Sequence, residues 1–195
     1  MIATRSLFAG LTLFTVTGLT ALVSSPAADA VAPAQDSFDV AMDGSSFHFE
    51  GATTPNGVPA DGTPFVISGY IYPGGTFERH GDLSGVDANG DPTFPELVVG
   101  EFICRGWHKQ DGDATTGVIA VTTQTFDFDL DHAGEQMVVT NGIELADFNT
   151  PFKRPVTGGS GFFAGRDLVC EQVMLGGGFN PSGGFNASFE FMTID

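Results

Sequence analysis

The chain has 195 residues, a length that suits one domain of moderate size. Hydrophobic residues make up 42% of it, which argues against a disordered chain. The 7 Lys and Arg residues against 24 Asp and Glu residues give a net charge of −17, and so acidic a surface argues against nucleic acid and anionic lipid as partners.

Residues 1–30 are typical of a secretory signal peptide. Arg5 precedes an apolar run over residues 7–23, and Ala28-Asp29-Ala30 matches the A-x-A cleavage pattern. A retained membrane anchor is the alternative, but the apolar run is short for a full span and no basic cluster follows it. We therefore expect cleavage after Ala30, an extracellular product that does not contact the membrane afterwards, and a flexible lead-in over residues 31–36.

The remaining residues, 37–195, alternate apolar and polar side chains and show almost no helical periodicity. Turns rich in Gly, Pro, Asn and Asp separate the alternating segments. In chain order, the expected strands cover Phe38 to Met42, Phe47 to Phe49, and residues 64–75, 96–110, 115–131, 134–146, 167–175 and 183–194. Seven or eight strands without helices between them favour one all-β domain, an antiparallel barrel or sandwich.

The same alternation predicts which side chains point into the domain. On the strand 96–110, Phe102 and Cys104 lie on the face opposite Arg105 and Trp107, which the charge marks as the outer face. An inner face rich in Phe, with sparse polar groups, fits a cavity for an apolar ligand, and it fits a solidly packed core equally well. The candidate ligand-lining residues are Phe102, Thr122, Gln124, Phe126, Phe189 and Phe191.

Cys104 and Cys170 are the only cysteines. In an exported protein we expect them to form a disulfide, because thiols oxidise outside the cell. The alternative is two buried thiols that pack as small apolar groups.

The segment Gly158 to Gly165 reads G-G-S-G-F-F-A-G and fits the dinucleotide pattern G-x-G-x-x-G/A. That pattern needs a strand before it and a helix after it, and Pro155 and Gly165 disfavour both. We therefore expect a structural turn between two late strands and no nucleotide site. The turn glycines are Gly158, Gly159, Gly161 and Gly165.

No metal or cofactor site is expected. The four histidines lack the spacing of a zinc site, and they are His48, His80, His108 and His132. The acidic stretch Asp87 to Asp91 lacks the twelfth-position Glu of an EF-hand loop. Four glutamates could act as acid–base groups, but nothing brings two of them together, so solvated carboxylates on strand faces are expected at Glu101, Glu144, Glu171 and Glu190.

The glycine segment, extended to residues 157–166 (T-G-G-S-G-F-F-A-G-R), resembles the T-G-G-T-G-x-Y-x-G-A-x-G-like motif of the allene oxide cyclase-like and dirigent-like barrels. The blocks V-V-G-E-F-I-C-R-G-W-H, T-T-Q-T-F-D-F-D and G-G-F-N-A-S-F-E-F-M-T-I are also similar to blocks of secreted relatives, and the resemblance covers residues 37–194. It implies an eight-stranded closed antiparallel barrel of calycin-like outline, often a trimer, that holds an apolar reactive molecule. It assigns no catalytic residue.

These observations predict a secreted barrel that binds a small apolar or aromatic molecule. If it guides a reaction, as dirigent-like proteins do, it does so without catalytic groups of its own. Two alternatives remain: a cyclase or isomerase of the allene oxide cyclase type, and a structural or interaction barrel with a filled core.

Overall fold

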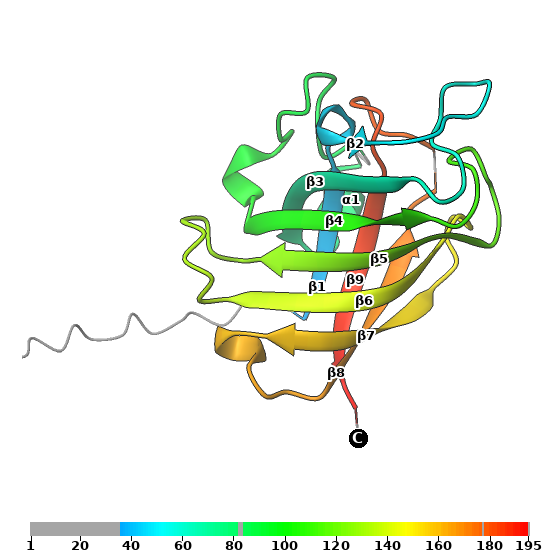
Figure 1. Cartoon of the computed structure of the whole chain (residues 1–195). Coiled ribbons are helices and arrows are strands. Elements are labelled where there is room, and N and C mark those ends of the chain that lie inside the picture. The colour runs from blue at the N-terminus through cyan, green and yellow to red at the C-terminus, as the bar shows by residue number, and fades with distance from the viewer. Residues whose placement is uncertain (1–35, 82–83, 177, 195) are drawn as a thin grey trace, which may run out of the picture.

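The computed structural model describes residues 36–81, 84–176 and 178–194, which form a closed antiparallel barrel of eight strands with one short extra strand (Figure 1). The strands lie side by side in the order β1-β9-β8-β7-β6-β5-β4-β3, and pairing of β1 with β3 closes the ring. The extra strand, β2, pairs with the start of β3. In chain order the strands are β1 (Ser37–Met42), β2 (His48–Phe49), β3 (Pro64–Pro73), β4 (Gly100–His108), β5 (Val118–Asp127), β6 (Met137–Leu145), β7 (Phe152–Gly159), β8 (Leu168–Met174) and β9 (Asn186–Thr193).

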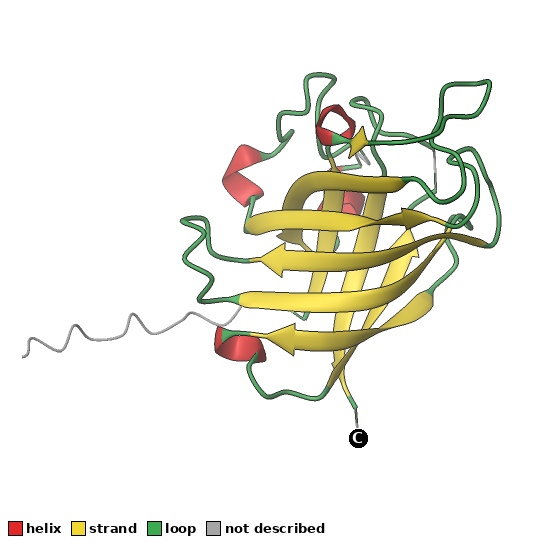
Figure 2. Ribbon diagram, viewed as in Figure 1, coloured by secondary structure: helices red, strands yellow, loops and turns green. Residues whose placement is uncertain are grey.

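Helices contribute little to the described part of the chain, as Figure 2 shows. The α-helix α1 (Thr76–His80) follows β3, and left-handed glycines flank it on both sides. Three single turns of 3-10 helix complete the set: η1 (Gly44–Ser46), η2 (Pro95–Leu97) and η3 (Gly161–Phe163). No helix among the described residues has the length and apolar character needed to cross a bilayer.

The expected all-β fold, an eight-stranded closed antiparallel barrel, is confirmed. The one barrel strand that the sequence did not predict is β7, which contains Pro155 and ends in two glycines. Pro155 is the last β7 residue paired with β8, and Val156 is the first paired with β6. The missing N–H of the proline therefore lies where the strand changes pairing partner, the kind of irregularity at which a proline is tolerated in a sheet.

Five phenylalanine rings fill one half of the barrel. All are 3% exposed or less, and the ring of Phe126 lies 4.9–5.2 Å, between centroids, from three of the others. We call them the Phe cluster: Phe38, Phe102, Phe126, Phe189 and Phe191. Burial of this apolar surface makes this half of the barrel a packed core.

Candidate functional site

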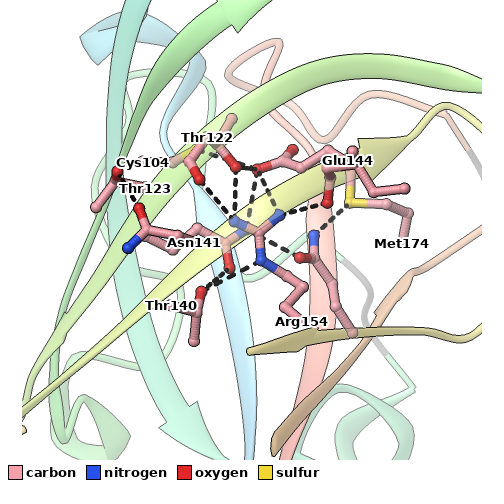
Figure 3. A network of polar contacts seen from close by, with 11 residues as sticks. Cys104, Thr122, Thr123, Thr140, Asn141, Glu144, Arg154 and Met174 are labelled. Atoms are coloured by element: carbon pink, nitrogen blue, oxygen red, sulfur yellow. Dashed lines mark hydrogen bonds and ion pairs between the residues drawn. The ribbon is translucent and has the colours of Figure 1, made fainter. Parts of the chain in front are cut away.

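A layer of polar side chains crosses the middle of the barrel (Figure 3). Each points inward from its strand and is 8% exposed or less. We call this layer the polar belt, and its members are Cys104 on β4, Thr122 and Gln124 on β5, Thr140 and Glu144 on β6, Arg154 on β7 and Gln172 on β8.

Arg154 is the cation of the polar belt and has no exposed surface. Its Nη2 donates hydrogen bonds to the carbonyl oxygen and the Oγ1 of Thr122, at 3.1 and 2.8 Å. Its Nη1 donates to the carbonyl oxygen of Ile143 at 2.6 Å, and its Nε donates to Thr140 Oγ1 at 3.2 Å. Its Nη1 also lies 3.9 Å from Glu144 Oε1, so a carboxylate compensates the buried charge.

Glu144 is the anion of the polar belt. Its Oε1 accepts hydrogen bonds from Thr122 Oγ1 at 2.8 Å, Gln124 Nε2 at 2.9 Å and Cys104 Sγ at 3.2 Å. All hydrogen bonds from the described residues to this carboxylate end on Oε1, so Oε2 remains free to accept another. The expectation of a solvated carboxylate at Glu144 is wrong, because its partner Arg154 comes from the strand that the sequence did not predict.

Beyond the polar belt, away from the Phe cluster, the barrel is hollow. A cavity of about 390 Å³ lies there, within the usual range of roughly 300–1,000 Å³ for ligand sites. Three polar side chains of the barrel wall reach it: Cys104, His108 and Glu144. Five aromatic rings line it: Phe47, Phe65, Phe148, Phe179 and Phe185.

The mouth of this cavity is built by loops. The lining residues outside the strands come from the connections β1–β2, β2–β3, β4–β5, β6–β7 and β8–β9, which gather at one end of the barrel (Figure 1). One example from each of these five loops, in the same order, is Phe47, Pro59, Ala114, Phe148 and Phe179. A strand framework with a mouth of loops is a common arrangement for binding sites.

His108 is the last residue of β4 and points into this cavity. It is only 7% exposed, its ring packs 4.8 Å from the ring of Phe65, and neither ring nitrogen has a hydrogen-bond partner in the described structure. Burial lowers the pKa of His108, and the negative charge of Glu144 acts in the opposite direction. The ring is therefore neutral at pH 7, with one nitrogen that donates and one that accepts.

The six predicted ligand-lining residues occupy two other layers of the barrel. Thr122 and Gln124 belong to the polar belt, and the four phenylalanines belong to the Phe cluster. The cavity lies further along the same strands, at Ala120, the next inward position after Thr122 on β5, and at His108, two inward positions after Cys104 on β4. The alternation that places Phe102 and Cys104 on the inner face also places His108 there, so the inward direction of His108 could have been predicted from the sequence.

The expected disulfide between Cys104 and Cys170 is wrong. Both are free, buried thiols. They lie on β4 and β8, which three strands separate in either direction around the barrel, so they face inward from opposite walls. A disulfide needs Cα atoms within roughly 7 Å of each other. Burial raises the pKa of Cys170 to about 12, and burial and then Glu144 raise that of Cys104 well above its usual value, so both thiols stay protonated.

The glycine segment lies at the corner between β7 and β8. Gly158 and Gly159 end β7, and Gly161 and Gly165 adopt left-handed conformations with φ of 54° and 67°. The three-residue turn η3 follows β7, in place of the long helix that a dinucleotide site uses. Phe163 anchors the corner from η3, with its ring stacked 5.4 Å from that of Phe128.

Two further expectations concern metals and export. Among the residues described by the structure, no three His, Cys, Asp or Glu side chains gather in a metal-binding arrangement. The signal peptide at residues 1–30 lies outside the described residues, and so do residues 31–35 of the lead-in.

Comparisons with known proteins add little. No family model matches the sequence, and no curated protein matches it significantly. Among solved structures, 16 chains match. One, described as pyocyanin demethylase, is 13% identical, covers 80% of this chain and 98% of its own, and has a TM-score of 0.48. At that level the likeness supports no conclusion about the site.

Proposed function

We propose that the protein binds a small, mostly apolar molecule in the cavity beyond the polar belt. The observation that carries this proposal is the contrast between the two halves of the barrel, one filled by the Phe cluster and the other hollow and lined by aromatic rings. His108 and Glu144 present unpaired polar atoms to this hollow. A buried polar group without a partner costs about 1–3 kcal/mol, which a ligand can recover by pairing with it.

A second candidate function is an isomerase or cyclase that works by proton transfer. It is favoured by the lowered pKa of His108, because a neutral imidazole can accept a proton near pH 7. The Glu144 carboxylate lines the same cavity and would stabilise the imidazolium that this transfer forms, until the imidazolium returns the proton to another atom of the substrate. The filled, purely structural barrel is disfavoured, because only one half of the interior is packed.

The resemblance of residues 157–166 supports the further proposal that the chain is a distant member of the allene oxide cyclase-like and dirigent-like barrels, with a trimer as the expected assembly. The pattern of residues 1–30 supports secretion.

Native mass spectrometry of the protein, purified without organic solvent, tests binding. We expect a retained apolar molecule, and we expect Ala146→Phe to reduce its occupancy at least tenfold, because Ala146 lines the cavity and a ring there would occupy it. The matched control is Val121→Phe, which adds a ring at an exposed position on β5. Equal occupancy in both variants would place the ligand elsewhere and overturn the proposal.

A further inference from the structure

The polar atoms that face the cavity restrict what it can hold. Glu144 offers Oε2, an acceptor with no hydrogen-bond partner in the described part of the chain. His108 offers a donor and an acceptor, both unpaired and buried. His108 on β4 pairs with Ala120 on β5, and Ala120 pairs with Glu144 on β6, so the two side chains enter the cavity from the same level of the barrel wall.

The charges in the barrel wall beside the cavity already balance. Arg154 and Glu144 form a buried pair of opposite sign, and His108 is neutral. A charged ligand would therefore add an uncompensated charge to a largely apolar space, which is costly. An anion would also face Asp113, an exposed carboxylate that lines the cavity, and the acidic surface of a chain with net charge −17.

We infer that the cavity selects an uncharged molecule, apolar over most of its surface, that carries a hydroxyl group at its buried end. The hydroxyl donates a hydrogen bond to Glu144 Oε2, and the ring N–H of His108 donates a second hydrogen bond to the hydroxyl oxygen. Carboxylates such as fatty acids are rejected. This inference rests on the proposed binding function and specifies the chemistry of its ligand.

The other residues of the polar belt fix the position of the Glu144 carboxylate on which this selectivity depends. Thr122, Gln124 and Cys104 all donate to Oε1, which holds the carboxylate in one orientation and leaves Oε2 for the ligand. Arg154 in turn has all its contacts within the barrel and no exposed surface, so it compensates Glu144 without reaching the ligand itself. Preorganised acceptors of this kind discriminate strongly between a donor and its methylated analogue.

Isothermal titration calorimetry at pH 7 on the full chain tests the inference with four probes that share one ring system. They are 2-naphthalenemethanol, its methyl ether, 2-naphthoate and 2-naphthylmethylammonium. We expect the alcohol to bind about tenfold more tightly than the ether, because a hydrogen bond to a charged group contributes about 1.5–3 kcal/mol. Both charged probes should bind more weakly than the ether.

Glu144→Gln provides the sharpest variant. It removes the negative charge and leaves Arg154 uncompensated, so 2-naphthoate should now bind more tightly than the alcohol. His108→Phe should weaken the binding of the alcohol several-fold, because the ligand oxygen loses its N–H donor. The matched control is Glu190→Gln, the same change at an exposed carboxylate on β9, which should leave the order of the four probes unchanged.

The outcomes separate the two proposals. If no probe binds the wild-type protein, the proposed binding function fails and the inference fails with it. If the alcohol and the ether bind equally, or if 2-naphthoate binds best, the inference alone fails and binding stands. The wild-type series and His108→Phe decide the matter even where Glu144→Gln does not fold.

Discussion

Arg154 shows how a single residue organises the interior. Its guanidinium lies inside the barrel with no exposed surface and bonds to groups on β5 and β6. From the sequence, Arg154 stood beside a proline and close to a run of glycines, in a segment that looked like a turn. Its inward direction depends on β7 being a strand, so neither Arg154 nor the burial of Glu144 could be predicted.

Replacing the buried cation tests this account. We expect Arg154→Met to lower the free energy of unfolding by about 3–5 kcal/mol, because Glu144 would remain buried without a compensating charge. Urea denaturation measures the change. Arg105→Met, on the outward face of β4, should stay within about 0.5 kcal/mol of the wild type. The double variant Arg154→Met/Glu144→Met should recover part of the loss, and simple additivity would contradict a coupled pair.

The buried histidine predicts a pH dependence of stability. Burial lowers the pKa of His108 in the folded protein below its value of about 6.5 in the unfolded chain. The unfolded chain therefore binds more protons as the pH falls, so stability should decrease from above pH 6.5 down towards the lowered pKa.

Denaturation at several pH values measures this effect against two variants. His108→Phe should show a smaller loss of stability over that window than the wild type does. His48→Phe, at an exposed histidine on β2, should follow the wild type. A wild-type slope that persists in His108→Phe would assign the titration to another group.

At the scale of elements, most strands were predictable and their ends were not. Alternation places β4, β5 and β9 within their predicted ranges and correctly turns Phe102, Phe126 and Phe189 inward. It failed for β7, because proline and glycine disfavour a strand locally, while pairing to β6 and β8 overrides that preference. It also gave no sign of α1, which has only five residues.

The corner between β7 and β8 offers a test at this scale. A Cβ at Gly161 would collide with the backbone carbonyl oxygen of Glu135, and φ is 54° there. We expect Gly161→Ala to lower stability by about 1–3 kcal/mol. Gly158→Ala is the matched control, since a Cβ there meets nothing within 4 Å.

Thermal unfolding with and without a nucleotide completes this test. Added ATP or NAD should leave the melting temperature of the wild type unchanged, because the glycines of this corner form the turn between β7 and β8 and do not bind a phosphate. A rise in melting temperature that Gly161→Ala abolishes would mean that the segment binds nucleotides after all.

For the whole molecule, closure of the barrel decides which residues meet. The first barrel strand pairs with both β3 and β9, and this arrangement places β4 opposite β8. Inward direction was predictable for Cys104, but the distance across the barrel to Cys170 was not, because alternation carries no information on how strands are ordered in space.

Thiol counting tests this arrangement. Without reductant, we expect two reactive thiols per chain once the protein is unfolded, one from Cys104 and one from Cys170. In the folded protein both should react far more slowly with a thiol reagent, because burial keeps them protonated. If the unfolded, unreduced chain has no free thiol, then Cys104 and Cys170 form a disulfide after all.

The mouth of the cavity consists of five loops, whereas the Phe cluster and the polar belt belong to the strands. Residues that shape the mouth for a ligand and residues that stabilise the fold therefore lie in different parts of the chain. Loops at this end can change in length and composition while the strands keep their pairing, so one barrel can acquire new ligand shapes without being redesigned. The preference for an uncharged ligand would persist through such changes, because it resides in the belt.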